Sequence, residues 1–202
     1  MNHSRLDKVA RVGAAFWLLK VLTTTVGDVS GDALSQALHL GYAPSLLVAA
    51  LLSAVLLLAQ WRARRWRPVL YWAVMLAASA FGAELSDTLA RALHWGSAAT
   101  AGALAAALLA TCTAWRMHSG GPRVDTVRAP GDEGFYWLAV LLADSLGSVL
   151  GDLLGDSFGL GLLGSSAAFG VVLLLLLALR NATRANRGAL FWTAFVFSRI
   201  PL

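Results

Sequence analysis

The stretch Val21–Leu34, VLTTTVGDVSGDAL, places two carboxylates, Asp28 and Asp32, four residues apart within an apolar run long enough to cross a bilayer. Gly27 and Gly31 lie beside them with the same spacing. A carboxylate in the middle of a membrane costs about 3 kcal/mol or more, so it is seldom found there without a role. This stretch therefore predicts a membrane protein whose interior is polar and acidic.

The composition of the whole chain supports this class. Hydrophobic residues make up 58% of the 202 residues and charged residues 13%, and the mean hydropathy is +0.67. A soluble domain carries about twice that charged fraction. The single cysteine, Cys112, excludes an intramolecular disulfide and makes no metal site. The net charge of +5 comes from arginines between apolar runs, which indicates membrane orientation rather than nucleic-acid binding.

An aromatic pair ending in tryptophan recurs four times and marks an internal repeat. The pairs are Phe16-Trp17, Tyr71-Trp72, Tyr136-Trp137 and Phe191-Trp192. Ten residues after the first three tryptophans stand Gly27, Gly82 and Gly147. Fifteen residues after them stand Asp32, Asp87 and Asp152, and twenty-four residues after them stand Gly41, Gly96 and Gly161. Gap-free matching columns indicate duplication. We expect one transmembrane domain, 1–202, with repeats at 12–66, 67–131 and 132–186 and a partial repeat at 187–202.

Each repeat holds two apolar segments of membrane-spanning length. The first segments are Phe16–Gln36, Tyr71–Leu93 and Tyr136–Ser157, the second are Ser45–Gln60, Ala98–Trp115 and Leu160–Arg180, and a short one begins near Ala189. This predicts an all-α polytopic protein with about seven transmembrane helices. The second segments carry few ionisable residues and suit the lipid-facing side, whereas the first segments should face inward.

The loops predict the orientation. Thirteen basic residues fall on one side of the predicted spans: Arg5, Lys8, Arg11, Arg62, Arg64, Arg65, Arg67, Arg116, Arg123, Arg128, Arg180, Arg184 and Arg187. The opposite loops offer only Arg91. The positive-inside rule then places the N-terminus and these loops in the cytoplasm, with all repeats parallel. The aromatic pairs are expected to form a belt at the same membrane interface.

Carboxylates and neutral oxygens on the first segments are the candidate ion ligands. The primary set is Asp28, Asp32, Glu84, Asp87 and Asp152, and the secondary set is Asp144, Asp156, Thr24, Thr25, His39 and His94. Helical spacing puts Asp28 with Asp32 and Glu84 with Asp87 on shared faces. Adjacent carboxylates suit a hard divalent cation, and they equally suit protonation. The alternative is structural: each carboxylate caps a helix end or bonds a neighbouring helix. The identity of any metal stays open.

Two basic residues lie inside predicted spans. Arg199 and Asp144 both stand seven residues after a repeat tryptophan, so we expect them at equal depth as a structural ion pair. Lys20 could reach outward to the interface or serve as a counter-ion to Asp28. The spaced glycines, such as Gly27 and Gly31, predict close helix packing, with a broken helix at a binding site as the alternative.

The chain resembles a bacterial family labelled as uncharacterised membrane-anchored proteins. The resemblance rests on Lys20, Thr23-Thr24-Thr25-Val26-Gly27-Asp28, Leu38-His39-Leu40-Gly41-Tyr42, Phe135-Tyr136-Trp137 and Leu190-Phe191-Trp192. It covers nearly the whole chain and implies four copies of a T-x-x-G-[DET] hairpin in a cytoplasmic membrane. The family's last copy typically continues as R-P-L-G-A-T-x-G-D, whereas here the sequence stops at Leu202. That departure predicts a truncated chain or a short natural form.

The leading hypothesis is an integral membrane transporter for a small inorganic cation, with divalent ions among the candidates. The alternative is a scaffold or accessory protein whose buried carboxylates hold helices together. The sequence carries no G-x-S-x-G, H-E-x-x-H, C-x-x-C or phosphate-cradling loop, so we expect no enzyme and no cofactor. The expected partners are the lipid bilayer and a small cation, without nucleic acid, and an oligomer is compatible with the pattern.

Overall fold

The protein is all-α. The computed structural model describes residues 9–33, 35, 39, 41–63, 65–120, 130–182 and 187–199. Within these ranges seven α-helices follow one another: α1 (Ala14–Asp32), α2 (Tyr42–Arg62), α3 (Pro68–Asp87), α4 (Ser97–Ser119), α5 (Pro130–Asp152), α6 (Gly161–Ala182) and α7 (Arg187–Phe197). Two five-residue π-helical turns, η2 (Thr88–Ala92) and η3 (Leu153–Ser157), extend α3 and α5.

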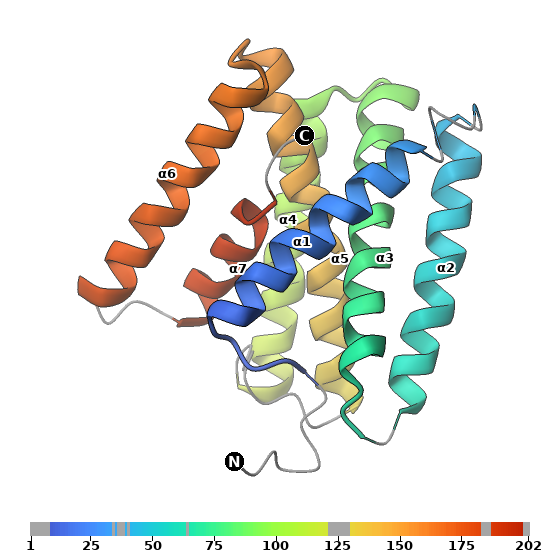
Figure 1. Ribbon diagram of the computed structural model, residues 1–202, viewed down its shortest axis with the longest axis vertical. Helices are drawn as coiled ribbons and strands as arrows, with labels where there is room; N and C mark the ends of the chain where they lie inside the picture. Colours follow the sequence, from blue (N-terminus) through green and yellow to red (C-terminus); the bar gives the residue numbers. More distant parts are fainter. Residues whose placement is uncertain are drawn as a thin grey trace.

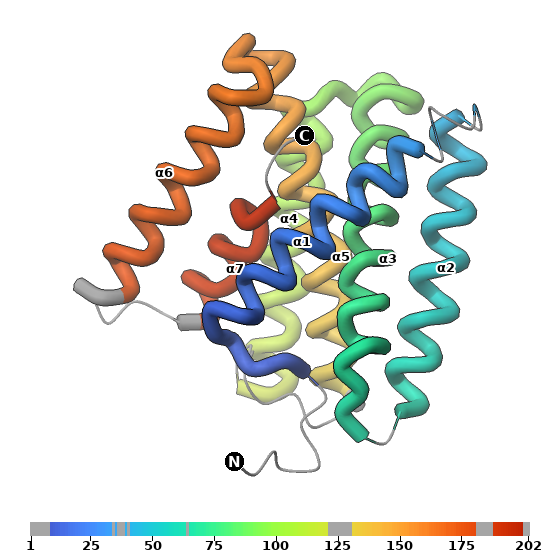
Figure 2. Tube along the Cα trace, in the orientation of Figure 1, coloured from blue at the N-terminus to red at the C-terminus, as the bar shows by residue number. Residues whose placement is uncertain are grey.

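The helices run alternately up and down (Figure 1). The four odd-numbered helices share one direction, as the parallel repeat predicts. α3 packs between α1 and α5, and α5 packs against α7. Each even-numbered helix packs against the first helix of the following repeat: α2 against α3, α4 against α5 and α6 against α7. Successive repeats therefore interlock rather than stand as separate hairpins, as the chain trace in Figure 2 also shows.

Burial separates the two kinds of helix as the sequence predicts. Among the helices of spanning length, α3 and α5 are the most buried, and α2 and α6 are the most exposed. Exposed leucines and valines cover α2 and α6, which is the composition expected of a lipid-facing surface.

The number of candidate spans is smaller than the predicted seven. Five helices in the described part of the chain are long and apolar enough to cross a membrane, namely Tyr42–Arg62, Pro68–Ala92, Ser97–Ser119, Gly131–Ser157 and Gly161–Arg180. The apolar helix Gly188–Phe197 is shorter. α1 has 19 residues, but its lysine, two aspartates and three threonines lower its hydropathy. The charged residues of α1, which predict an acidic interior, are thus the same residues that lower its hydropathy as a candidate span.

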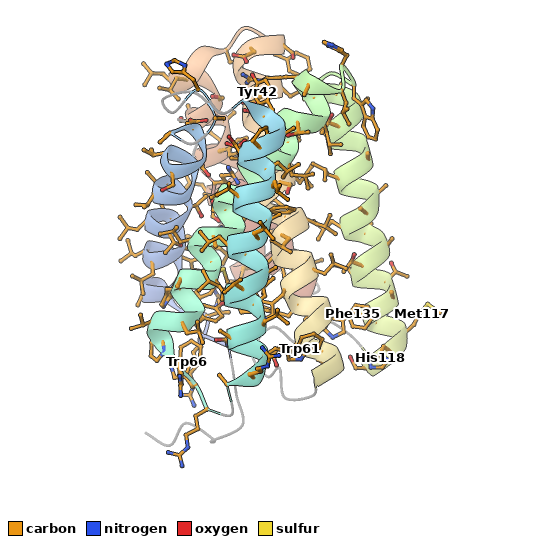
Figure 3. All side chains as sticks on the ribbon, turned by 90° about the vertical axis from the view of Figure 1, so that its right-hand side faces the viewer. Tyr42, Trp61, Trp66, Met117, His118 and Phe135 are labelled. Atoms are coloured by element: carbon orange, nitrogen blue, oxygen red, sulfur yellow. The ribbon has the colours of Figure 1, made fainter. Side chains whose placement is uncertain are left out.

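The two ends of the bundle differ in charge. The basic end, where α1, α3, α5 and α7 begin, holds Arg11, Arg62, Arg67 and Arg116. Six of the thirteen basic residues lie outside the described residues, namely Arg5, Lys8, Arg64, Arg123, Arg128 and Arg184, as do residues 200–202. The opposite end is called here the acidic end, because Asp87 at the end of α3 and Asp152 at the end of α5 lie there. Figure 3 shows Tyr42 at the acidic end, and Trp61, Trp66 and His118 at the basic end.

The repeated aromatic pairs form a layer inside the basic end, not the predicted belt around it. Phe16, Tyr71, Tyr136, Trp137, Phe191 and Trp192 are all buried. Their rings join the four first helices in a closed circuit: Phe16–Trp72 at 5.7 Å between centroids, Tyr71–Trp137 at 5.4 Å, Tyr136–Trp192 at 6.0 Å and Phe16–Phe191 at 5.9 Å. The Tyr71 and Tyr136 hydroxyls hydrogen-bond at 2.5 Å. We call α1, α3, α5 and α7 the first-helix ring, and the eight aromatic residues the aromatic layer.

One glycine per repeat allows these helices to approach each other. A Cβ atom on Gly27 would lie 2.6 Å from the Cβ of Ser79, and one on Gly82 would lie 2.9 Å from the Ser145 nitrogen. A Cβ atom on Gly147 would lie 2.7 Å from the carbonyl oxygen of Val196. The same offset from the tryptophan thus builds the same close contact three times, which confirms the packing interpretation for these three glycines.

Candidate functional site

A layer of buried charges crosses the middle of the first-helix ring. We call Lys20, Asp28, Asp144 and Arg199 the central layer. All four side chains are buried. Lys20 of α1 donates to the Asp144 carboxylate of α5 at 2.5 Å and to the Thr24 hydroxyl at 2.7 Å. Its ammonium group also lies 4.2 Å from the centroid of the Phe195 ring. Lys20 therefore points into the bundle, not outward to the interface.

Arg199, which follows α7, connects the other three first helices. Its guanidinium forms an ion pair with the Asp28 carboxylate of α1. It also donates to the backbone carbonyls of Asp144 at 2.8 Å and Ser79 at 3.5 Å. Asp28 in turn accepts a hydrogen bond from the Ser79 hydroxyl at 3.1 Å. Two cations and two carboxylates thus neutralise each other within one layer.

These contacts correct the predicted Asp144–Arg199 ion pair. The two residues do meet at the expected depth, but Arg199 takes the main-chain carbonyl of Asp144, and Lys20 takes its carboxylate. Neither alternative for Lys20 is observed, because Lys20 turns into the bundle and Arg199 takes the place of counter-ion to Asp28. Lys20 stands eight residues before Asp28 on the same helix, which is about 12 Å along its axis, whereas the Asp144 carboxylate lies within hydrogen-bonding distance.

The repeat explains why these residues meet, and it brings Ser79 to the same level. Seven residues after the repeat tryptophans stand Thr24, Ser79, Asp144 and Arg199. All four touch the central layer. Ser79 is the contribution of the second repeat, and its hydroxyl donates to the Asp28 carboxylate.

A second group of charges lies toward the acidic end. Arg91 in η2 contacts three carboxylates: Asp87 at 3.3 Å, Asp152 at 3.3 Å and Asp156 at 3.8 Å. Glu84, one turn earlier on α3, is buried, and its Oε2 atom has no hydrogen-bond partner in the described part of the structure. We call Glu84, Asp87, Arg91, Asp152 and Asp156 the acidic-end cluster.

The remaining predicted ligands belong neither to the central layer nor to the acidic-end cluster. Asp32 is exposed, although it makes an interaction of its own, and Thr25 is half-buried. His39 and His94 are exposed on outer turns, where both adopt positive φ angles of 53° and 57°. Within the described ranges, no three His, Cys, Asp or Glu side chains are grouped so that they could hold a metal ion. Of the five primary ligands, Asp28 therefore lies in the central layer, Glu84, Asp87 and Asp152 lie in the acidic-end cluster, and Asp32 lies in neither group.

The two levels differ in net charge. The central layer has two cations and two carboxylates, while the acidic-end cluster has one guanidinium and four carboxylates. Side-chain exposure falls stepwise from the end inward: 78% for Asp156, 28% for Asp152 and 13% for Asp87. It reaches 2% at Glu84 and 0% at Asp144. The exposure of the carboxylates on α3, α5 and η3 thus decreases from the acidic end toward the middle of the bundle.

Comparison with known proteins finds one family. A family model described as Repeat of Unknown Function (DUF347) matches residues 15–65, 70–120 and 135–186. Each match begins one residue before a repeated aromatic pair and covers two helices, so the internal repeat predicted from the sequence is confirmed. No curated protein and no solved structure matches the chain.

Proposed function

The chain belongs to the DUF347 repeat family, and we propose that it is an integral membrane protein that moves a small inorganic cation through the first-helix ring. The acidic end is the mouth of the path, and the basic end faces the cytoplasm. In a bacterium the membrane would be the cytoplasmic one. The five long apolar helices support membrane insertion.

The observation that carries the proposal is the decrease in exposure of the carboxylates from Asp156 at the surface to Glu84 inside the bundle. Their combined charge exceeds that of Arg91, so this end attracts cations and repels anions. A buried carboxylate is costly unless it is paired, and the Oε2 atom of Glu84 has no hydrogen-bond partner among the described residues. Such a residue at membrane depth is typical of an ion path.

The central layer then acts as the gate of the path. Asp28 is the innermost carboxylate of α1, and it forms an ion pair with Arg199 in the structure. A cation reaches Asp28 only when the guanidinium moves away, and protonation of Asp28 would release it. Arg199 also interacts electrostatically with Asp87 and Asp152, so the charges of the central layer and of the acidic-end cluster influence each other.

A scaffold is the second candidate, and the neutral central layer favours it. Each of its charges has a partner on another helix, so the layer ties the first-helix ring together whether or not an ion passes. The lack of a metal-binding group in the described residues fits this alternative too.

Ion flux into liposomes distinguishes the two candidates. The purified full-length chain is reconstituted, and uptake of protons, Na⁺, K⁺, Mg²⁺, Ca²⁺ and Mn²⁺ is followed with dyes and isotopes. We expect flux of at least one cation, a loss of more than tenfold in Asp28→Asn, and a similar loss in Asp87→Asn.

Asp132→Asn is the matched control. Asp132 lies at the basic end and accepts a hydrogen bond from Trp115 at 2.9 Å, which asparagine can also accept. We expect its flux to equal that of the unmodified chain. The transporter proposal fails if no cation crosses in a preparation that is monodisperse and inserted in both orientations.

A further inference from the structure

We propose that the cation is the proton, and that the buried Glu84 carboxylate binds it inside the first-helix ring. This assignment rests on the proposed function, because it names the ion that the path carries. A hard metal cation needs about six or more oxygen ligands around one point. Within the described ranges no three His, Cys, Asp or Glu side chains are grouped so that they could supply them. A proton needs only one carboxylate oxygen.

Glu84 packs against α1, where its neighbours are a hydroxyl and like charges. Its side chain is 2% exposed, and its Oε1 atom lies 3.4 Å from the position that a Cβ atom on Gly31 would take. The hydroxyl of Ser35, just after α1, hydrogen-bonds to the carboxylate. The charged groups that act on it are Asp87 and Asp32, both carboxylates themselves. Its Oε2 atom has no hydrogen-bond partner in the described residues. A proton bound there removes a buried charge without any further ligand.

Two more buried carboxylates lie deeper in the ring. The Gly31 position beside Glu84 is three residues from Asp28, or about 4.5 Å along α1. Asp144 on α5 is fully buried and pairs with Lys20 through Oδ1, while its Oδ2 atom has no hydrogen-bond partner among the described residues. Asp28 and Asp144 interact electrostatically, so a proton on either one changes the charge that the other faces.

Two buried tyrosines continue this series toward the basic end. The side chains of Tyr71 and Tyr136 are 0% and 1% exposed, and their hydroxyls share a hydrogen bond of 2.5 Å. Both hydroxyls interact electrostatically with Asp144. The Tyr71 oxygen also accepts a hydrogen bond from the backbone N–H of Ala10, which precedes α1. A hydroxyl donates and accepts at once, so a pair of them relays a proton while staying neutral.

The proton moves by exchange of O–H bonds. At the acidic end a hydronium ion gives its proton to the Glu84 carboxylate, which leaves water and a neutral carboxyl group. The new O–H bond breaks when the proton passes to Asp28, and the neutral Asp28 carboxyl then releases the Arg199 guanidinium. Asp144 and the tyrosine pair pass the proton to the basic end. Each group returns to its first protonation state, so the cycle needs no other reactant.

Acidification of liposomes that hold the full-length chain tests the ion assignment. The vesicles contain K⁺ and a pH-sensitive dye, and valinomycin sets a potential that is negative inside. We expect the unmodified chain to acidify them and to take up no isotopic Na⁺, Ca²⁺ or Mn²⁺. Glu84→Gln keeps the shape of the side chain but not its proton-binding oxygen, and should slow acidification by about 100-fold or more. Glu84→Asp should retain measurable acidification, and Asp132→Asn, the control, should match the unmodified chain.

Infrared spectroscopy of the protein in detergent gives a second measurement that does not depend on flux. A protonated carboxyl group has a C=O stretching band that is distinct from the bands of a carboxylate. We expect one such band to appear and disappear as the pH is changed. It should be missing in Glu84→Gln and present in Asp132→Asn.

The outcomes separate the ion assignment from the proposed function. Uptake of a metal cation without acidification overturns the proton and leaves the transporter standing. Full acidification by folded Glu84→Gln overturns the role of Glu84. If no cation crosses, the transporter fails, and the infrared band decides on Glu84 alone: its loss in Glu84→Gln supports proton binding there, and an unchanged spectrum overturns it. If Glu84→Gln is not monodisperse, the ion selectivity of the unmodified chain decides.

Discussion

The central layer and the acidic-end cluster use the same residue types in opposite ways. In the central layer two cations face two carboxylates, every side chain is buried, and the contacts reach 2.5–2.8 Å. In the acidic-end cluster one exposed guanidinium serves three carboxylates at 3.3–3.8 Å. Balanced charges that are shielded from solvent hold helices in register, while unbalanced charges near the surface remain available to a ligand.

This contrast shows that position along a helix alone does not give a carboxylate its role. Asp28 and Asp87 both lie on first helices and both face other charged residues. Asp28 is bonded to two groups outside α1, the Arg199 guanidinium and the Ser79 hydroxyl, whereas Asp87 shares the half-exposed Arg91 side chain with two further carboxylates. Four experiments test the contrast, beginning with the most disruptive.

Lys20→Met should have the largest effect. It leaves Asp144 buried without its counter-charge, which lowers the free energy of unfolding by about 3–5 kcal/mol. The measurement is thermal unfolding in detergent, followed by circular dichroism. The double variant Lys20→Met/Asp144→Leu removes both charges and should recover most of the loss. A double variant as unstable as the single one would show that the pair does not act as a unit.

Gly147→Ala should come next. The added methyl group meets the Val196 carbonyl and the Arg199 side chain, so α5 and α7 must move apart, at a cost of about 1–3 kcal/mol. Gly170→Ala on α6 is the control, because nothing lies within 4 Å of its Cβ position. That variant should gain about 0.5–1 kcal/mol from its higher helix propensity. Equal melting temperatures for the two variants would contradict the close contact.

Arg91→Gln should change stability by less than about 1 kcal/mol, since its ion pairs are partly solvated. The same thermal assay compares it directly with Lys20→Met. A loss as large as that of Lys20→Met would erase the difference between the two levels and would make Arg91 a structural residue.

His94→Gly should have the smallest effect, a gain of about 0.5 kcal/mol. His94 has a φ angle of 57°, a conformation that costs a side chain roughly 1 kcal/mol and that glycine adopts freely, although glycine is also freer when unfolded. The third repeat already has Gly159 at this position, with a φ angle of 68°. The reverse change, Gly159→His, should lower the melting temperature. A large loss in His94→Gly would instead indicate a role for the imidazole.

The architecture could be predicted from the sequence because the copies of the repeat match at several positions. The tryptophan offsets placed the close-packed glycines and brought Asp144 and Arg199 to one depth, and both features are present. The apolar second segments correctly indicated the more exposed helices.

The pairing of charges was not predictable in the same way. Offsets give depth along a helix but not which of two neighbouring cations reaches a given carboxylate, and that choice depends on side-chain length and helix rotation. Lys20 and Arg199 therefore exchanged their expected partners. The aromatic pairs were misplaced for a related reason, because tryptophan near a basic loop is equally compatible with a lipid interface and with a packed interior.

The partner of Lys20 has a consequence for how the chain is made. Asp144 is 124 residues farther along, and ribosomes add roughly 5–20 residues per second, so α1 exists for about 6–25 seconds before α5 is synthesised. During that interval a lysine and an aspartate of a weakly hydrophobic helix have no counter-charge from α5 or α7. The charge partners of the first helix are therefore among the last parts of the chain to be made, and α1 can adopt its final contacts only after α5 and α7 have left the ribosome.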